Sequence, residues 1–190
     1  MLRLFVAVDL PVSEQQAVAR LCANVHGARW SKPHQLHITL RFMGGTPEEE
    51  LPAIRERLAR VPLSPFELEL RGVGVFPAAA RRPRVLWLGV TPREPLCRLE
   101  RDIDRVLAVA GPAQGSAREP AREFSPHLTL ARLSGKPDET LTRFLARHAD
   151  YRGASHRVDS FRLYKSTLHP SGAVHEVLAT YPLGPNCRES

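Results

Sequence analysis

The sequence predicts an α+β fold built from two duplicated halves, and three observations lead to this prediction. The motif His-x-Thr-Leu begins at His37 and again at His127, 90 residues further along a chain of 190 residues. Segments with the alternating pattern of strands are interleaved with segments of helical periodicity along the chain. A hydrophobic fraction of 43% with 25% charged residues suffices for a buried core and argues against a disordered chain.

The two motifs belong to a longer internal repeat. Residues 37–60 align with residues 127–150 without a gap, and nine of the 24 aligned pairs are identical. Average residue usage would give roughly one or two identities by chance. Both segments contain an alternating strand, a glycine for the turn, a proline and an acidic first helical turn. The repeat is therefore a strand–turn–helix unit, with helices expected near 47–60 and 137–149.

The other elements follow the same order in both halves. Before each motif comes a strand that ends at a proline, and a helical segment lies between that strand and the motif. Strand-like segments follow each repeat unit, so the first half is predicted as β-α-β-α-β-β, with its last strand adjoining the second half. In chain order these segments are strand 4–11, helix 13–25, strand 66–76, strand 85–92, helix 94–109, strand 156–167 and strand 173–181, with loops at 77–84 and 110–123.

Strand geometry gives the two motifs a shared chemistry. Residues i and i+2 of a strand point the same way, so His37 shares a face with Thr39, and His127 shares one with Thr129. The aliphatic residues between them point into the core. If a pseudo-twofold axis relates the halves, both pairs face one cleft from opposite sides.

This arrangement suits displacement at a phosphorus atom. A neutral imidazole accepts a proton from the attacking hydroxyl or water while a protonated one delivers a proton to the leaving oxygen. Threonine hydroxyls donate to non-bridging oxygens, and an arginine neutralises the developing charge. The chemistry needs no metal and no cofactor. The alternative is a purely structural pair of strand histidines, which the repetition in register disfavours.

The overall composition predicts an anionic ligand and a cellular compartment. The net charge is +7, and 24 of the 27 basic residues are arginines, whose planar fork binds phosphate through two hydrogen bonds. A compositional bias toward arginine is the alternative explanation. Cys22, Cys97 and Cys187 are too scattered for a zinc site or a disulfide framework, which favours a reducing compartment. With neither a signal peptide nor a membrane span in the sequence, we expect a cytoplasmic protein.

The paired motifs resemble those of the 2H phosphoesterase superfamily. Six segments together resemble its RNA 2′,3′-cyclic phosphodiesterase branch, also called 2′-5′ RNA ligase, over residues 3–183. They are RLFVAVDLP, LHITLRFMG, GVGVFP, RRPRVLWLGV, PHLTLAR and LYKSTLHPSGAVHEVLATYPL. The resemblance implies one bilobal, pseudo-twofold domain over residues 1–190, with antiparallel sheets facing a central cleft and helices outside.

The resemblance also implies an activity and roles for individual residues. It implies metal-independent opening of a 2′,3′-cyclic phosphate at an RNA or nucleotide end to a 2′-phosphate. His37 is then the proton donor and His127 the proton acceptor, in roles that the reverse reaction exchanges. The alternatives are reversible 2′-5′ ligation of RNA halves, such as tRNA halves, in the same site, or a non-catalytic RNA-end binder. Neither a membrane nor an obligate protein partner is expected.

Two further residues bring the resemblance and the strand pattern into conflict. Phe42 and Arg132 occupy equivalent positions in the repeat, and strict alternation points both away from the histidine face. The resemblance implies that Phe42 stacks on a base and that Arg132 binds the phosphate. A bulge or twist at the strand end would reconcile the two. Arg41 lies on the His37 face by alternation, where it would contact RNA or be solvated.

The remaining candidates are less specific. His34 lies just before the first motif and is a candidate for the cleft, whereas His169 and His175 flank a turn and are interpreted as surface or hairpin residues. Trp30 and Trp87 are assigned to the core. A basic loop would either guide an RNA backbone or simply be solvated. It contains Arg81, Arg82 and Arg84.

Overall fold

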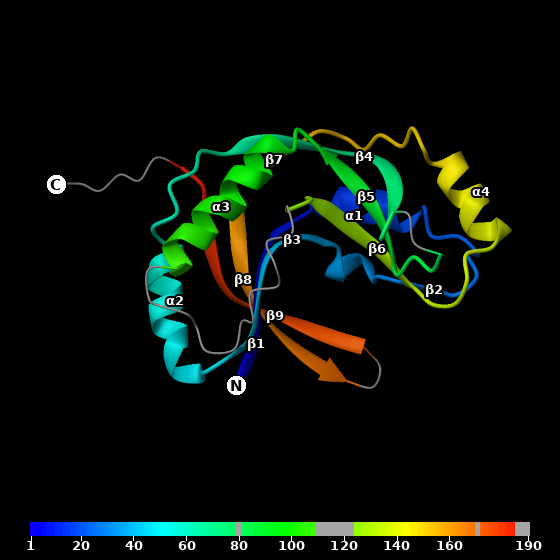
Figure 1. Ribbon diagram of the computed structural model, residues 1–190. Coiled ribbons are helices and arrows are strands. Elements are labelled where there is room, and N and C mark those ends of the chain that lie inside the picture. Colours follow the sequence, from blue (N-terminus) through cyan, green and yellow to red (C-terminus); the bar gives the residue numbers. More distant parts are fainter. Residues whose placement is uncertain (79–80, 109–123, 170–171, 185–190) are drawn as a thin grey trace.

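The computed structural model describes residues 1–78, 81–108, 124–169 and 172–184 (Figure 1). The predicted loop 110–123 and Cys187 lie outside these residues, as does part of the predicted loop 77–84. The elements in chain order are β1 (Leu2–Asp9), α1 (Val12–Ala19), β2 (Ala28–Trp30), η1 (Pro33–Gln35), β3 (His37–Thr46), η2 (Glu48–Glu50), α2 (Leu51–Leu58), β4 (Phe66–Phe76), β5 (Val85–Thr91), α3 (Glu94–Ala108), β6 (His127–Leu133), α4 (Glu139–Arg147), β7 (His156–Val158), β8 (Ser160–His169) and β9 (Gly172–Pro182). The predicted α+β class is confirmed.

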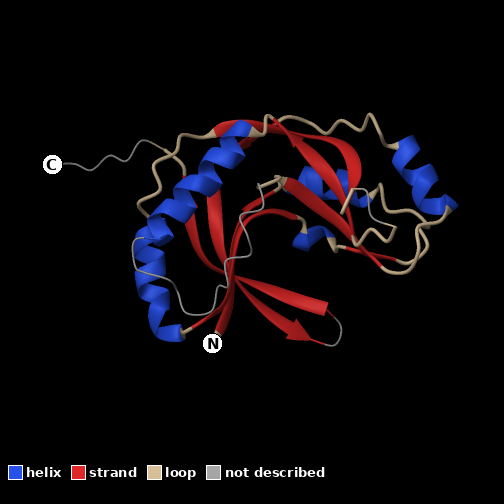
Figure 2. Ribbon diagram, in the orientation of Figure 1, coloured by secondary structure: helices blue, strands red, loops and turns tan. Residues whose placement is uncertain are grey.

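One nine-stranded antiparallel sheet runs through the molecule in the order β7-β4-β5-β6-β3-β1-β8-β9, with β2 paired to β6 (Figure 2). Its middle is narrow, because β3 and β6 are paired only at Ile38 and Leu128. On either side of this point, β1 pairs with β3 as β5 pairs with β6: Ala7 lies opposite Thr39, and Trp87 lies opposite Thr129. The register therefore has the predicted pseudo-twofold relation, with its axis between the two motif strands.

The two lobes are not the two halves of the sequence. Strand β4 follows the first repeat helix but pairs with β5, and β8 follows the second repeat helix but pairs with β1. Each lobe thus contains strands from both halves. The predicted strand 156–167 is in fact two strands, since β7 pairs with β4 at one end of the sheet and β8 pairs with β1 near the other.

The hydrophobic core lies on the face of the sheet that the helices cover. Aliphatic residues alternate inward along the central strands, as Leu4, Val6 and Val8 do on β1, and each is at most 1% exposed. The helices contribute their own apolar faces to the same cluster, with α2 and α3 along one lobe and α1 and α4 beside the other (Figures 1 and 2). The helix residues in this cluster are Val18, Ile54, Leu58, Leu96, Leu99, Ile103, Leu141 and Phe144. On the opposite face Phe5, Ala7 and Tyr164 form a second, small buried cluster.

Local capping sets where the repeat helices begin. The Asp138 carboxylate accepts hydrogen bonds from the backbone N–H groups of Thr140 and Leu141, so α4 starts at Glu139 and not at the proline of the repeat. In the first half a short 3₁₀ turn, η2, precedes α2. Helix α1 is shorter than predicted and ends at Ala19. Within the described ranges, no helix is long and apolar enough to span a bilayer.

Candidate active site

The two motif histidines stand at equivalent positions, each as the first residue of its strand, and each is half-buried. His127 Nδ1 lies 2.7 Å from the carbonyl oxygen of Ser125, and because a carbonyl oxygen only accepts, the ring nitrogen is the donor. The backbone of Gln35, two residues before His37, acts in the same sense on His37, because it raises the pKa of that imidazole. A neutral imidazole fixed in this way keeps its other nitrogen available as a proton acceptor.

Aromatic rings hold the two imidazoles from the sides. The His37 ring stacks on Phe5 with centroids 5.0 Å apart, and the edge of His175 approaches it at 5.5 Å and 83°. The His127 ring makes a similar edge contact with Phe76, with centroids 4.9 Å apart. Such contacts restrict ring rotation. Both imidazoles are therefore held by at least one aromatic neighbour, and His127 also by a hydrogen bond.

A β-bulge follows each motif threonine. On β3, Ala7 is paired with Thr39 and the preceding Val6 with Arg41, so Leu40 is the extra residue. On β6, Trp87 is paired with Thr129 and Leu86 with Ala131, so Leu130 is the extra residue. One inserted residue reverses the alternation of every side chain that follows. The predicted bulge is thus confirmed in each half.

The bulges decide which side chains join the histidine face. Phe42 is opposite Phe5, with ring centroids 5.8 Å apart, and is 66% exposed. Arg132 is exposed, and its charge contributes to lowering the pKa of His127. Both therefore lie on the side that the family resemblance implied. The expectation for Arg41 is wrong: the bulge turns it to the other side, where it forms an ion pair with Asp104 of α3 at 3.1 Å.

The electrostatics lower the pKa of both histidines. Burial, followed by the charge of His175, lowers the pKa of His37 to about 4, and the backbone of Gln35 opposes this only partly. Burial also lowers the pKa of His127, with an opposing contribution from the Ser125 hydrogen bond and a smaller lowering one from Arg132. The surroundings of both imidazoles thus favour the neutral form in the free protein, and a bound anion would oppose this by raising their pKa.

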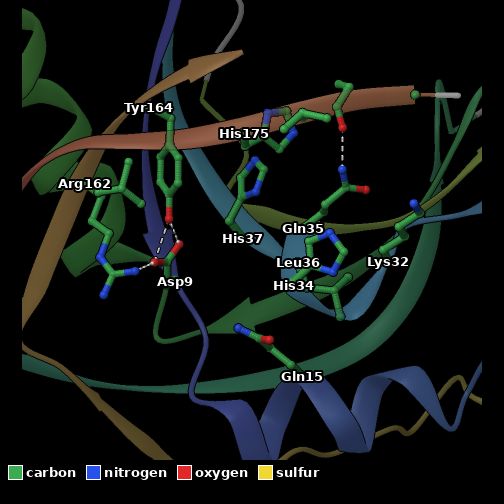
Figure 3. A pocket seen from close by; sticks show the side chains of 14 residues that line it. Asp9, Gln15, Lys32, His34, Gln35, Leu36, His37, Arg162, Tyr164 and His175 are labelled. Atoms are coloured by element: carbon green, nitrogen blue, oxygen red, sulfur yellow. Dashed lines mark hydrogen bonds and ion pairs between the residues drawn. The ribbon is translucent and has the colours of Figure 1, made fainter. Parts of the chain in front are cut away.

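A cavity of about 300 Å³ opens beside His37 (Figure 3). His34 and His175 line it, so the expectation for His34 is confirmed. His175 belongs to the β8–β9 hairpin, as expected, and its side chain also lines this cavity beside the His37 ring. Among its lining residues, the Tyr164 hydroxyl donates to the Asp9 carboxylate, which also pairs with Arg162. This network joins β1 to β8, the two strands that form the surroundings of His37. No group of three His, Cys, Asp or Glu side chains suited to a metal ion occurs among the described residues.

The assignment of Trp87 to the core is also wrong. Its ring is half-buried, lies opposite Thr129 and packs against Phe76 at 5.1 Å on the histidine face. The alternation of LWLGV already contained the signal, since Leu86 and Leu88 point into the core and Trp87 lies between them. Trp30, by contrast, packs on the core against Phe144, with ring centroids 5.5 Å apart, as expected.

Paired His-x-Thr strands at the centre of a pseudo-symmetric antiparallel sheet define the 2H phosphoesterase class. The chain belongs to the 2′-5′ RNA ligase superfamily, whose family model matches residues 10–170. Similar curated proteins named RNA 2′,3′-cyclic phosphodiesterase occur in Archaeoglobus fulgidus, at 33% identity over 95% of this chain and 99% of the relative, and in Thermus thermophilus, at 37% identity over 96% and 90%. A crystal structure of a Thermus thermophilus protein superposes with a TM-score of 0.77 and 31% identity, covering 97% of this chain and 99% of the other.

Proposed function

We propose that the protein hydrolyses 2′,3′-cyclic phosphate ends of RNA or nucleotides to 2′-phosphates, with His37 and His127 as the acid–base pair. The observation that carries this proposal is the equivalence of the two histidines. Each starts one of two neighbouring antiparallel strands, and each ring has an aromatic neighbour on the same face of the sheet. The activity in the names of relatives that match nearly the whole chain supports the same reaction.

In the proposed mechanism, water attacks the phosphorus of the cyclic phosphate and His127 accepts its proton. The bond from phosphorus to the 3′ oxygen breaks, and His37 donates a proton to that oxygen, which leaves a 2′-phosphate and a 3′ hydroxyl. The hydroxyls of Thr39 and Thr129 donate to the non-bridging oxygens, and Arg132 neutralises the charge that develops on them. The exposed ring of Phe42 stacks on the terminal base.

The lowered histidine pKa values bear on this mechanism. The proton donor has to be protonated in the complex, yet the pKa of His37 is about 4 in the free protein. A bound phosphate carries a negative charge, which raises the pKa of an adjacent imidazole. The bound substrate therefore raises the pKa of His37, so that His37 carries the proton that it donates to the 3′ oxygen. If the 5′ hydroxyl of a second RNA takes the place of water, the same groups catalyse 2′-5′ ligation, the second candidate that the family name supports.

Alanine substitutions test the proposal. His37→Ala and His127→Ala should each lower kcat/KM for a dinucleotide with a 2′,3′-cyclic phosphate end by at least about 100-fold, the lower range for loss of a general acid or base. The matched control is His26→Ala, because this side chain is 85% exposed. Circular dichroism should show all three variants folded, and EDTA should leave the wild-type rate unchanged. Activity above one tenth of wild type in either motif variant would contradict the mechanism.

The proposal extends to the setting in which the enzyme works. We infer that residues 1–190 act as a single bilobal domain on RNA ends or nucleotides, without an obligate protein partner. A reducing, cytoplasmic location is supported by the free thiols of Cys22 and Cys97. Ligation and hydrolysis are separated by comparing the rates with cleaved tRNA halves and with small cyclic nucleotides.

A further inference from the structure

A second hollow on the surface is lined by arginines. It has a volume of about 560 Å³, within the usual range for ligand sites, and no carboxylate lines it. The arginines that line this hollow, which we call the arginine basin, are Arg29, Arg82, Arg84 and Arg132, and all four are exposed. Among the described residues, the ion pairs involve other arginines and none of these four.

The backbone forces these like charges together. Arg29 on β2 is the direct cross-strand partner of Arg132 on β6, an arrangement in which two like charges repel. Leu133 N donates to the carbonyl oxygen of Arg84 at 2.8 Å, which attaches the basic loop to the same strand. The sheet therefore gathers cations without matching anions, and a bound anion would relieve their repulsion.

A glycine allows the close approach that builds the basin. Gly27 has a φ of +73°, and a Cβ at this position would lie 2.2 Å from the carbonyl oxygen of Ser134. Ser134 N donates to the carbonyl oxygen of Gly27 at 2.9 Å, and this bond fixes the start of β2 against the end of β6. The positions of Arg29 and Arg132 are thus set by main-chain hydrogen bonds and not by flexible loops.

The basin is continuous with the candidate active site. Strand β6 begins at His127, and the bulge at Leu130 turns Arg132 toward the histidine face while Arg132 also lines the basin. Guanidinium groups bind phosphate through two parallel hydrogen bonds, and several of them along a groove follow a nucleic-acid backbone. We propose that the arginine basin binds the phosphodiesters that precede the terminal cyclic phosphate of an RNA strand, an inference that rests on the proposed function.

Substrate length provides the test. The two substrates are a nucleoside 2′,3′-cyclic phosphate with a free 5′ hydroxyl and a trinucleotide ending in the same cyclic phosphate. Wild-type protein should have the higher kcat/KM on the trinucleotide. In the variant Arg29→Ala/Arg82→Ala/Arg84→Ala, the ratio of the two kcat/KM values should fall at least tenfold. The salt dependence of kcat/KM for the trinucleotide should become less steep, by about 0.7 in logarithmic slope for each lost phosphate contact.

The matched control removes the same charge elsewhere. Arg20, Arg98 and Arg157 are exposed, lie outside both cavities and have no ion-pair partner among the described residues, so the variant Arg20→Ala/Arg98→Ala/Arg157→Ala should keep the wild-type ratio. An equal fall of this ratio in both triple variants would show a general effect of net charge and would overturn the proposal for the arginine basin. A wild-type ratio near one would overturn it as well.

A failure of the proposed function is recognised separately. It would appear as the absence of turnover on both substrates by wild-type protein. Binding of a fluorescent trinucleotide with a 2′,3′-cyclic phosphate end, followed by polarisation, then tests the basin without catalysis. A tenfold weaker affinity in the basin variant than in the control variant supports the basin, and equal affinities overturn it.

Discussion

The two motif histidines have the same place in the fold but different neighbours. His37 is enclosed by Phe5 and His175, whereas His127 has Phe76 beside it and the charge of Arg132 nearby. Equal geometry allows either ring to act as acid or base, and the surroundings make the two unequal. Duplication has thus been followed by divergence of the residues that contact each ring.

The lowered pKa values predict where activity is highest. The proposed chemistry requires one protonated and one neutral imidazole, a state most populated between the two pKa values. In the free protein burial lowers the pKa of His37 to about 4 and also lowers the pKa of His127 from its usual value of 6.5. The profile of kcat/KM against pH should therefore have its optimum below pH 6.5 and decline as the pH rises through neutrality. An optimum above pH 7 would contradict this prediction.

His175 predicts a shift of the optimum of that profile. Its charge lowers the pKa of His37, so His175→Phe keeps the ring contact and removes the charge. The pKa of His37 should rise, and the pH optimum should move to a higher pH than in wild type. The control is His169→Phe on the same hairpin, where the side chain is exposed and the optimum should stay in place. An unmoved optimum in His175→Phe would exclude electrostatic tuning by this residue.

At the scale of single elements, close packing between β4 and β5 supports the surroundings of His127. Gly74 on β4 lies beneath the Trp87 ring, and a Cβ there would be 2.3 Å from Trp87 Cζ2. Gly74→Ala should displace the ring and lower the free energy of unfolding by about 1–3 kcal/mol, the usual cost of overpacking. Urea denaturation measures the loss. Gly184→Ala is the control, because no atom lies within 4 Å of its added Cβ, and equal stability of the two variants would contradict this packing.

The sequence predicts strands from alternation and helices from periodicity, and most of these elements are confirmed. It does not predict the register, because pairing between distant segments determines it. Phe42 and Arg41 illustrate the consequence: one extra residue, Leu40, exchanges the faces to which they point. The resemblance to a family corrects what alternation alone gives wrongly for Phe42. It gives no comparable guidance for His175, which reaches His37 only because β8 and β9 join β1.

Pairing between distant segments also explains why the predicted strand 156–167 is two strands. The apolar pattern on either side of Asp159 is continuous in sequence, but Val158 is paired with Phe66 and Ser160 with Pro182. A short sequence window contains no information about which partner strand it will meet. Short β2 was not predicted because three residues are too few for a pattern, although it positions Arg29.

For the whole molecule, the exchange of strands between lobes predicts that neither half folds alone. A fragment of residues 1–80 lacks β5, the partner of β4, and β8, the partner of β1. Residues 81–190 lack β1, β3 and β4, so β5 and β8 each lose a neighbour. Because edge strands without partners leave apolar faces and main-chain groups exposed, each fragment should show no cooperative thermal transition by circular dichroism.

Mixing the two fragments should restore both the fold and the chemistry, because all pairings of the sheet become available between the chains. The expected result is a cooperative transition in the mixture, together with turnover of a cyclic-phosphate dinucleotide. When the first fragment carries His37→Ala, the transition should return without turnover, which separates assembly of the sheet from completion of the site. A cooperative transition in residues 1–80 alone would show that β4 and β1 do not depend on strands from the other half, and would contradict the interleaved architecture.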